Sequence, residues 1–489
     1  MRLNIYSPLS QLLIVGVVLF ACPGLYGAIT GLGAGGGKPT SASVGNITNC
    51  VLYGVYTIVA FFAGSAINVF GVRFTLCIGA FGYPIYAAGL WIYDRTGQEV
   101  PPILFGGVLG LGAGFLWSAA GFVQYSYADE GVKGLYIVVQ WLMVAFGSSV
   151  GAAIAFGVNF NKTESATGSP TSIYLIFIIL ELVAIVFGFL FIVHPREIRR
   201  KDGTAIAIFQ DKRTFAEEAM AYVQLSKDWK IWALYVVGLS SEMCLSFQST
   251  MSAHVFNLRT RSLVSLCFWL IQIPATLLLK PIFDANLPRR TRGFMAAGYL
   301  SIFVISSWIV ETIWLRGPNS ITVHEAALNL DWTDSAARVG PLFAGYVLNG
   351  VIYACWQSVV QFVIATLAND PKLTARYAGL FKSAVSAGMT VSFGVTAGNT
   401  EFLPQLIWQF TQQMISLAFL LFICLFITET NYFQEKDVVV PTYVDEILHG
   451  RVDVDALKTH GYNTIGNEKF ASSDEKPSRG GGNVKTAEC

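Results

Sequence analysis

Few residues in this sequence could do chemistry, and the most conspicuous are charged side chains inside long apolar runs. Glu242 lies near the middle of one run, with Gln248 six residues further on, and Glu181 and Lys382 lie inside two others. If these runs cross a membrane, a charge at their centre costs roughly 2.5–3.5 kcal/mol, so the side chain must face a cavity or a partner. We expect Glu242 to be functional and Glu181 to hydrogen-bond to a neighbouring helix. Lys382 could line a cavity or extend toward the cytosolic surface.

The rest of the sequence offers no catalytic or metal-ligating pattern. The five histidines are scattered, and none of the eight cysteines has C-x-x-C spacing. Residues 31–40 read GLGAGGGKPT, but a phosphate-binding loop needs Ser or Thr after its lysine, and Pro39 follows Lys38 here. We therefore expect no enzymatic activity, no cofactor and no metal.

The composition determines which elements must position these residues. Of the 489 residues, 54% are hydrophobic and 13% are charged, whereas soluble domains average about 25% charged residues. With 47 glycines and 13% aromatic residues, this composition is typical of helices packed in lipid. It excludes a disordered chain, a disulfide-stapled secreted module and an ordinary cytosolic enzyme. Lys plus Arg is 32 and Asp plus Glu is 31, so no cationic excess indicates nucleic acid, and the expected partner is the bilayer.

A bilayer core needs about 20 apolar residues per helix, and the sequence contains twelve such segments. They are residues 9–31, 50–70, 74–93, 102–126, 134–158, 172–193, 230–253, 262–283, 293–315, 339–366, 377–398 and 402–427. The segment 377–398 is the weakest, because it is rich in small residues and carries Lys382. We therefore predict an all-α integral membrane protein with twelve transmembrane helices.

The positive charges predict the orientation. With both termini in the cytosol, most of the Lys and Arg residues fall in cytosolic loops and in the tail, as the positive-inside rule requires. The two N-x-[ST] acceptors, Asn46 and Asn161, then lie outside and are glycosylation candidates. The membrane could be the plasma membrane or an endomembrane.

The spans divide six and six around a basic polar stretch. Residues 1–193 form one half, 194–229 a cytosolic loop, 230–428 the second half, and 429–489 a cytosolic tail whose polar end should be disordered. Two six-helix halves joined by a basic loop are the layout of the major facilitator fold.

Two loops resemble the signature of that superfamily, in which an acid and several bases latch the halves in one conformation. The first is GSAINVFGVR at 64–73 and the second DANLPRRTR at 284–292. The residues that match are Gly64, Gly71, Arg73, Asp284, Arg289 and Arg290. Asn68 replaces the acid of the first loop, which puts an ionic latch there in doubt. The alternative for both loops is simple positive-inside anchoring.

A narrower resemblance spans residues 8–430. YSYADEGVKGLYIVVQWLMVAFGSSVGAAIAFGVNFN at 125–161, IVHPREIRRKDG at 192–203 and FNLRTR at 256–261 are similar to the fungal branch of the Unc-93-like family of the major facilitator superfamily. Members of the family are linked to potassium-channel regulation, ion homeostasis and receptor trafficking. The resemblance implies no settled substrate for the fungal branch.

In the fold that the sequence resembles, the first, fourth, seventh and tenth helices line a central cavity. The candidates that this implies are Tyr26, Trp117, Gln124, Tyr125, Glu242, Gln248, Asn349, Trp356 and Gln357, with Lys382 added from the eleventh helix. For the amides, hydrogen bonding between helices is an alternative to solute binding.

Two function classes remain open. One is a secondary transporter of a small polar or cationic solute, working by alternating access with Glu242 as a proton or cation site. The other is a non-transporting partner that regulates an ion channel or escorts another membrane protein. The polar cavity favours the first, whereas Asn68 and the single strong acid on the cavity helices favour the second.

Overall fold

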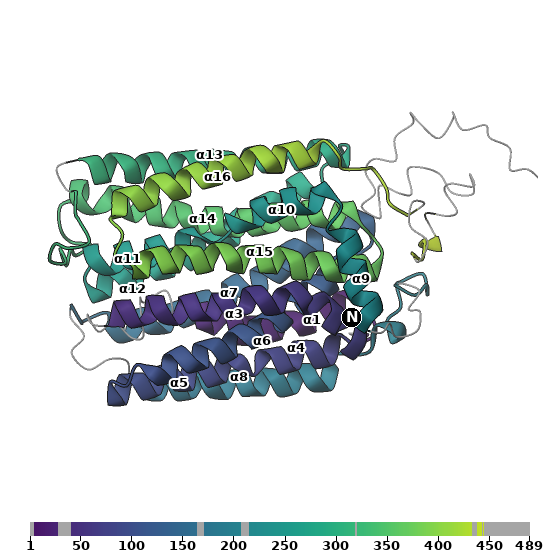
Figure 1. The fold of residues 1–489 in the computed structure, drawn as a ribbon, viewed down its shortest axis with the longest axis horizontal. Coiled ribbons are helices and arrows are strands. Elements are labelled where there is room, and N and C mark those ends of the chain that lie inside the picture. The colour runs from purple at the N-terminus through teal and green to yellow at the C-terminus, as the bar shows by residue number, and fades with distance from the viewer. Residues whose placement is uncertain are drawn as a thin grey trace, which may run out of the picture.

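A computed structural model of the chain describes residues 4–27, 41–163, 171–206, 215–317, 320–432, 438–442 and 444. Long helices lie side by side along one axis (Figure 1). Among these residues, the β pairing consists of two isolated bridges, Arg199–Ala205 and Phe256–Leu330. The glycine-rich residues 31–40 and the tail beyond 444 lie outside the described part.

The first half begins with α1 (Pro8–Leu19), which continues into a π-helical turn, η1 (Phe20–Gly24). It then contains α3 (Ser41–Phe70), α4 (Val72–Ala80), α5 (Gly82–Thr96), α6 (Val100–Ser126), η2 (Glu130–Val132), α7 (Lys133–Asn159) and α8 (Thr171–Phe191). Gly71 joins α3 to α4 with a φ of 83°, a left-handed conformation that favours glycine. This explains why the matching position of the loop signature is a glycine.

The connector contains η3 (Pro195–Glu197) and α9 (Phe215–Leu225). The second half contains α10 (Trp229–Leu239), α11 (Cys244–Val255), α12 (Leu258–Phe283), α13 (Arg289–Arg316), α14 (Ala336–Leu367), α15 (Pro371–Ala397) and α16 (Phe402–Cys424). Buried apolar side chains form two clusters, one centred on each half. Between the halves, α3 packs along α15 and α7 packs along α12.

Figure 1 shows the first half below and the second half above. The N-terminus, α9 and residues 426–432 lie at one end of the bundle, which we call the tail side. The opposite end carries residues 320–335 and is called the loop side.

Ten helices within the described ranges are long and apolar enough to cross a membrane. They account for ten of the twelve predicted segments. The eleventh segment, 377–398, is part of the continuous helix α15, which is not one of these ten. The seventh segment, 230–253, is divided into α10 and α11 by four residues that are not helical.

On the loop side, Asp331 ties the segment between α13 and α14 to the start of α12. Its carboxylate accepts hydrogen bonds from Arg259 and from Asn257 Nδ2, the latter at 2.6 Å. Arg259 also lies over the ring of Trp332, 4.9 Å from its centroid. The hydrogen bond from Arg259, with those from Asn257 and Thr333, holds the pKa of Asp331 well below its usual range despite some desolvation.

Candidate substrate cavity

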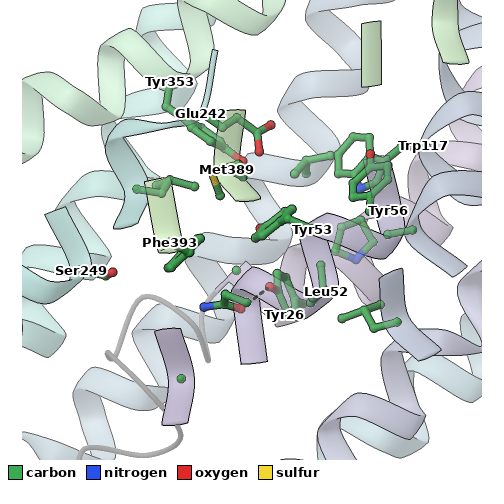
Figure 2. A pocket seen from close by; sticks show the side chains of 18 of the residues that line it. Tyr26, Leu52, Tyr53, Tyr56, Trp117, Glu242, Ser249, Tyr353, Met389 and Phe393 are labelled. Carbon is green, nitrogen blue, oxygen red and sulfur yellow. Dashed lines mark hydrogen bonds between the residues drawn. The ribbon is translucent and has the colours of Figure 1, made fainter. Parts of the chain in front are cut away.

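A cavity of about 100 Å³ lies between the two halves, at the centre of the bundle. Ten of the 24 described residues that line it are aromatic, and α3 contributes Tyr53 and Tyr56 (Figure 2). Among the described residues that line it, Glu242 and Lys382 carry the charges. An apolar, aromatic wall with a few polar groups is typical of small-molecule sites.

Glu242 occupies the break between α10 and α11. Residues 240–243 are not helical, and irregular backbone at membrane depth is tolerated only where it is buried in protein or lines a cavity. Part of the Glu242 side chain is open to the cavity. Discontinuous helices of this kind form ligand sites in many transporters.

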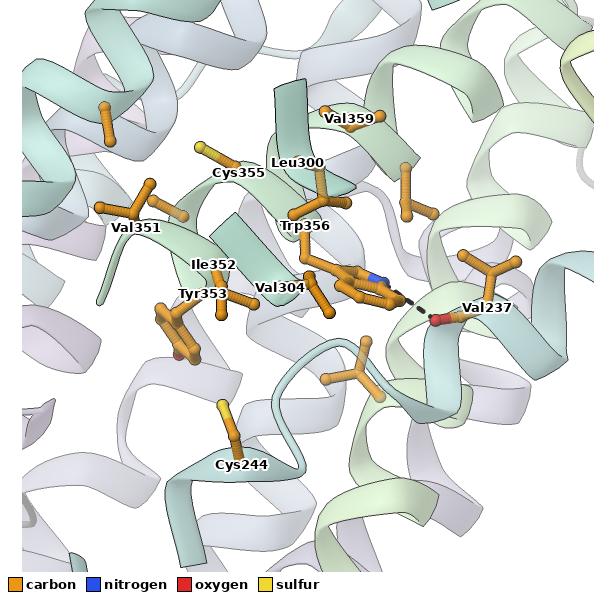
Figure 3. Close-up of a cluster of buried hydrophobic side chains, with 14 of the residues drawn as sticks. Val237, Cys244, Leu300, Val304, Val351, Ile352, Tyr353, Cys355, Trp356 and Val359 are labelled. Carbon is orange, nitrogen blue, oxygen red and sulfur yellow. Dashed lines mark hydrogen bonds between the residues drawn. The ribbon is translucent and has the colours of Figure 1, made fainter. Parts of the chain in front are cut away.

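Side chains from other helices satisfy the carbonyl groups that the break leaves without helical partners. Trp356 on α14 donates its indole N–H to the carbonyl of Val237 at 3.1 Å (Figure 3). Ser416 on α16 bonds to the carbonyl of Val236 at 2.9 Å. The break is therefore held by tertiary contacts and costs no unpaired carbonyl at these positions.

Small residues of α15 allow that helix to pack directly against the break. A Cβ atom on Gly388 would lie 1.8 Å from the carbonyl oxygen of Leu239. A Cβ atom on Gly238 would lie 2.6 Å from the Cβ of Ala384. The small-residue composition that weakens the apolar signal of α15 thus has a packing function.

One amide bridges the two charges. Gln357 donates from Nε2 to Glu242 Oε1 at 2.7 Å and accepts at its Oε1 from Lys382 Nζ at 3.0 Å. Lys382 also lies over the ring of Trp117, 4.5 Å from its centroid. Because an amide has a donor end and an acceptor end, Gln357 suits a carboxylate on one side and an ammonium on the other.

The π-helical turn η1 forms another part of the wall. Pro23 lies within it, and Tyr26 and Gly27 follow one residue after its end. The Tyr26 hydroxyl donates to Asn49 Oδ1 at 3.4 Å (Figure 2). Such π turns are frequently found at functional sites, and this one lies opposite the break of the seventh segment.

On the tail side, a buried ion pair joins the two halves. Arg289 of the second half contacts Glu130 of the first half at 2.7 Å. The other carboxylate oxygen of Glu130 accepts from Asn369 Nδ2 at 2.6 Å and from the Asn431 backbone at 2.8 Å. We call these four residues the tail-side latch.

Lys133 adds a second connection beside the latch. Its ammonium donates to the carbonyls of Ala365 and Ala368 at 2.6 and 3.1 Å, and to Asn369 Oδ1 at 2.6 Å. These carbonyls lie at the C-terminal end of α14, where a cation is favoured by unpaired carbonyl groups and the helix dipole. A lysine of the first half thus caps a central helix of the second.

The comparisons with known proteins agree with this architecture. No family model matches the chain. An uncharacterized membrane protein of Schizosaccharomyces pombe is 36% identical over 442 residues, covering 90% of this chain and 89% of that protein. An UNC93-like protein of the same yeast is 30% identical over 400 residues, covering 81% of this chain and 78% of that protein. The chain belongs to the UNC93-like family.

The fold of this UNC93-like protein is similar to the fold of several solved structures. A xylose transporter from E. coli superimposes with a TM-score of 0.57 at 15% identity, covering 88% of this chain and 100% of the other. The E. coli fucose:proton symporter gives 0.55 at 11% identity, with 87% and 100% covered. At such low identity the likeness concerns the fold alone, and it confirms the predicted major facilitator fold.

The predicted cavity residues of the UNC93-like protein separate into two groups. Tyr26, Trp117, Glu242 and Lys382 line the central cavity, and Gln124 lines a smaller space beside Trp117 and Lys382. Gln357 reaches the site through its hydrogen bonds to the two charged residues.

The other four candidates do not line the cavity. Tyr125 and Trp356 are buried among apolar side chains. Gln248 and Asn349 hydrogen-bond instead to Glu311 of α13, at 2.7 and 2.9 Å. Helical spacing alone could not distinguish these inward-facing positions, because a central helix is buried on every side.

Glu181 of α8 is buried beside α1, as expected for an interhelical position, but Oε2 of its carboxyl group has no hydrogen-bond partner. The predicted side-chain bond is thus missing at that oxygen. The backbone carbonyl of Glu181 accepts a hydrogen bond from Cys22 Sγ of η1 at 4.0 Å.

The two glycosylation candidates differ in placement. Asn46 lies inside α3, is buried and lines the cavity, so the structure leaves no room there for a glycan. Asn161 is exposed just after α7. The prediction that Asn46 lies in a loop is wrong, because α3 begins at Ser41, earlier than the predicted apolar segment.

The residues of the two loop signatures make separate packing, hydrogen-bond and ion-pair contacts. Gly64 allows α3 to approach α15, since a Cβ there would lie 2.8 Å from the Ala375 carbonyl. Arg73 bonds to the carbonyl of Ile192, Asp284 pairs with Lys280 at 2.8 Å, and Arg290 is exposed. The ionic latch uses Arg289 of the second loop with Glu130, an acid that sequence reasoning missed. The charged stretch ADEGVK at 128–133 was the available signal.

Proposed function

We propose that this UNC93-like protein is a secondary transporter that moves a small polar or cationic solute by alternating access. The observation that carries the proposal is the broken seventh segment, which presents Glu242 to a cavity between two six-helix halves. Relatives with solved structures and the same fold include a fucose:proton symporter, although likeness at that distance concerns the fold.

The chemistry of the wall favours a solute that combines a positive group with an apolar body. Aromatic faces attract cations within about 6 Å of the ring centroid, and Lys382 already occupies such a position over Trp117. An amine on the solute would compete for this face and for the carboxylate of Glu242. The tyrosines of α3 would cover the apolar part.

Glu242 is assigned as the proton or cation site. The latch and Lys133 join the two halves on the tail side. Rocking of the halves would break these contacts and expose Glu242 to the other aqueous phase. The proposal places the tail side in the cytosol of a plasma membrane or endomembrane, because its loops carry most of the Lys and Arg residues.

The test uses purified protein in proteoliposomes. A panel of small amines, quaternary ammonium compounds and amino acids is first ranked by thermal stabilisation, and hits are then measured for uptake driven by a pH gradient. Glu242→Gln keeps the hydrogen-bonding shape, so it should fold normally but lose the pH dependence of uptake, or keep exchange while losing uphill uptake. Glu99→Gln, at an exposed carboxylate, is the matched control.

Two results would contradict the assignment. If Glu242→Gln keeps the wild-type pH profile while Glu242→Leu is unstable, Glu242 is a structural hydrogen-bonding group. If no solute stabilises the protein or crosses the membrane above empty liposomes, the alternative function gains support. That alternative is a non-transporting partner of an ion channel or another membrane protein, and Asn68 in place of the signature acid favours it.

A further inference from the structure

A second carboxyl group, Glu311 on α13, is completely buried away from the cavity. Its Oε1 accepts two hydrogen bonds, from Gln248 Nε2 on α11 at 2.7 Å and from Asn349 Nδ2 on α14 at 2.9 Å. Asn349 Nδ2 also lies 2.8 Å from Ser307 Oγ. The group therefore joins three helices, one of which is the loop-side part of the broken segment.

The space around Glu311 fits a carboxyl group closely. A Cβ atom on Gly345 would lie 2.7 Å from Glu311 Cγ and 2.8 Å from its Oε1. Position 345 of α14 must therefore be a glycine for the Glu311 side chain to fit. Glu311 is thus a built part of the packing between α13 and α14.

No cation faces this carboxyl group within the described part of the chain. Ion pairs there do not include Glu311, and the titratable group that faces it from α11 is the thiol of Cys244. On the other adjacent helices, Arg261 of α12 interacts with Tyr346 of α14, and α16 contributes Gln413, which bonds to Trp308. An ionised carboxylate buried without a cationic partner is strongly disfavoured.

The hydrogen-bond pattern lacks one donor. Glu311 Oε2, Gln248 Oε1 and Asn349 Oδ1 are all buried acceptors without a partner. Each of the two amide nitrogens bonds to Oε1 of the carboxyl group, and no hydrogen bond from the described residues reaches Oε2. A proton on the carboxyl group would supply a donor among three acceptor oxygens.

We propose that Glu311 is a proton-binding residue separate from Glu242, and that its proton keeps α11 docked on α13 and α14. An adjacent face of α11 carries Leu245 and Ser249, which line the cavity. Loss of the proton would leave a buried charge and favour release of α11, so protonation of Glu311 controls the loop-side wall of the cavity. The inference does not require that the protein transports a solute.

Infrared difference spectroscopy on the purified full-length protein tests the protonation state directly. At neutral pH, the carbonyl stretch of a protonated carboxyl group should be present in wild type and in Glu99→Gln and should lose intensity in Glu311→Gln. An unchanged band in Glu311→Gln would overturn the proposal, because it would mean that Glu311 is ionised.

Thermal unfolding gives a second readout that does not depend on the spectrum. A proton held only in the native state makes the folding equilibrium constant fall about tenfold for each unit of rising pH. We expect this decline in wild type and a flatter profile in Glu311→Gln. If Glu311→Gln fails to fold, the thermal stability of wild type is compared in sodium chloride and in choline chloride. Stabilisation by sodium chloride over choline chloride would indicate a bound sodium ion and overturn the proposal, whereas equal stability with the pH decline would support it.

Discussion

Removing the arginine of the tail-side latch should open the interface between the two halves. Arg289 and Glu130 are both buried, with their charged atoms 2.7 Å apart. At an effective dielectric constant of about 20, charges at that separation attract by about 6 kcal/mol. In Arg289→Met, Glu130 keeps its bonds from Asn369 and Asn431 on Oε1 but loses the cation on Oε2.

The net cost of breaking a buried pair in this way is about 3–5 kcal/mol. In a state with the tail side open, Glu130 would be hydrated, so most of this cost falls on the closed state alone. A shift of about 3 kcal/mol changes the ratio of the two states roughly 150-fold. Arg290→Met removes the same charge from an exposed neighbouring position and should change the ratio little.

The opening can be measured by the alkylation rate of a reporter cysteine, Thr374→Cys, in a background without the native cysteines. Thr374 is buried at the interface, and its hydroxyl lies 2.6 Å from that of Ser126 in the other half. The rate should rise strongly in Arg289→Met and stay low in Arg290→Met. Equal rates in the two variants would refute the reasoning. In a Glu130→Gln background, Arg289→Met should have a much smaller effect, since the pair is already broken.

Two further predictions concern the ends of the bundle. Asp331→Asn should lower the thermal stability at neutral pH, because the lowered pKa of Asp331 stabilises the folded state. This stabilisation is present above the unfolded pKa of about 3.9 and is lost as the pH falls. The difference from wild type in unfolding scans should therefore shrink at acid pH, and a constant difference would contradict the ion-pair account. Deleting residues 465–489 should leave expression and monodispersity in detergent unchanged. Deleting 438–489 should in addition speed alkylation of the Thr374→Cys reporter, because Arg200 donates to the Val439 carbonyl at 3.0 Å and Asp202 accepts from the Thr442 backbone N–H at 2.9 Å. Equal alkylation rates for the two deletions would show that residues 438–464 do not hold the tail side closed.

The sequence determined the class and layout of this protein because hydropathy is a one-dimensional signal. About 20 consecutive apolar residues are needed to cross a bilayer wherever the helix lies in the bundle, so the spans and the two halves could be predicted without knowing any contact. Glu242 and Lys382 could be selected for the same reason, since a charge inside an apolar run stands out on its own.

The break of the seventh segment could not be predicted in this way. Residues 240–243 read SSEM and contain neither proline nor glycine, which are the usual local signals of a helix interruption. The alternative backbone is stable because Trp356 and Ser416, from later helices, bond to its carbonyls. Those partners are more than a hundred residues away in sequence.

Glu130 and Glu311 illustrate the same division. In the sequence, Glu130 is one of several charges in a loop, and Glu311 lies near the end of a helix, where a polar residue is unremarkable. Only the packed structure makes Glu130 the partner of Arg289 and encloses Glu311 between α11, α13 and α14. Hydropathy reports how each residue interacts with its solvent, whereas these roles depend on which side chains the fold brings within hydrogen-bonding distance, and that is decided by the tertiary structure.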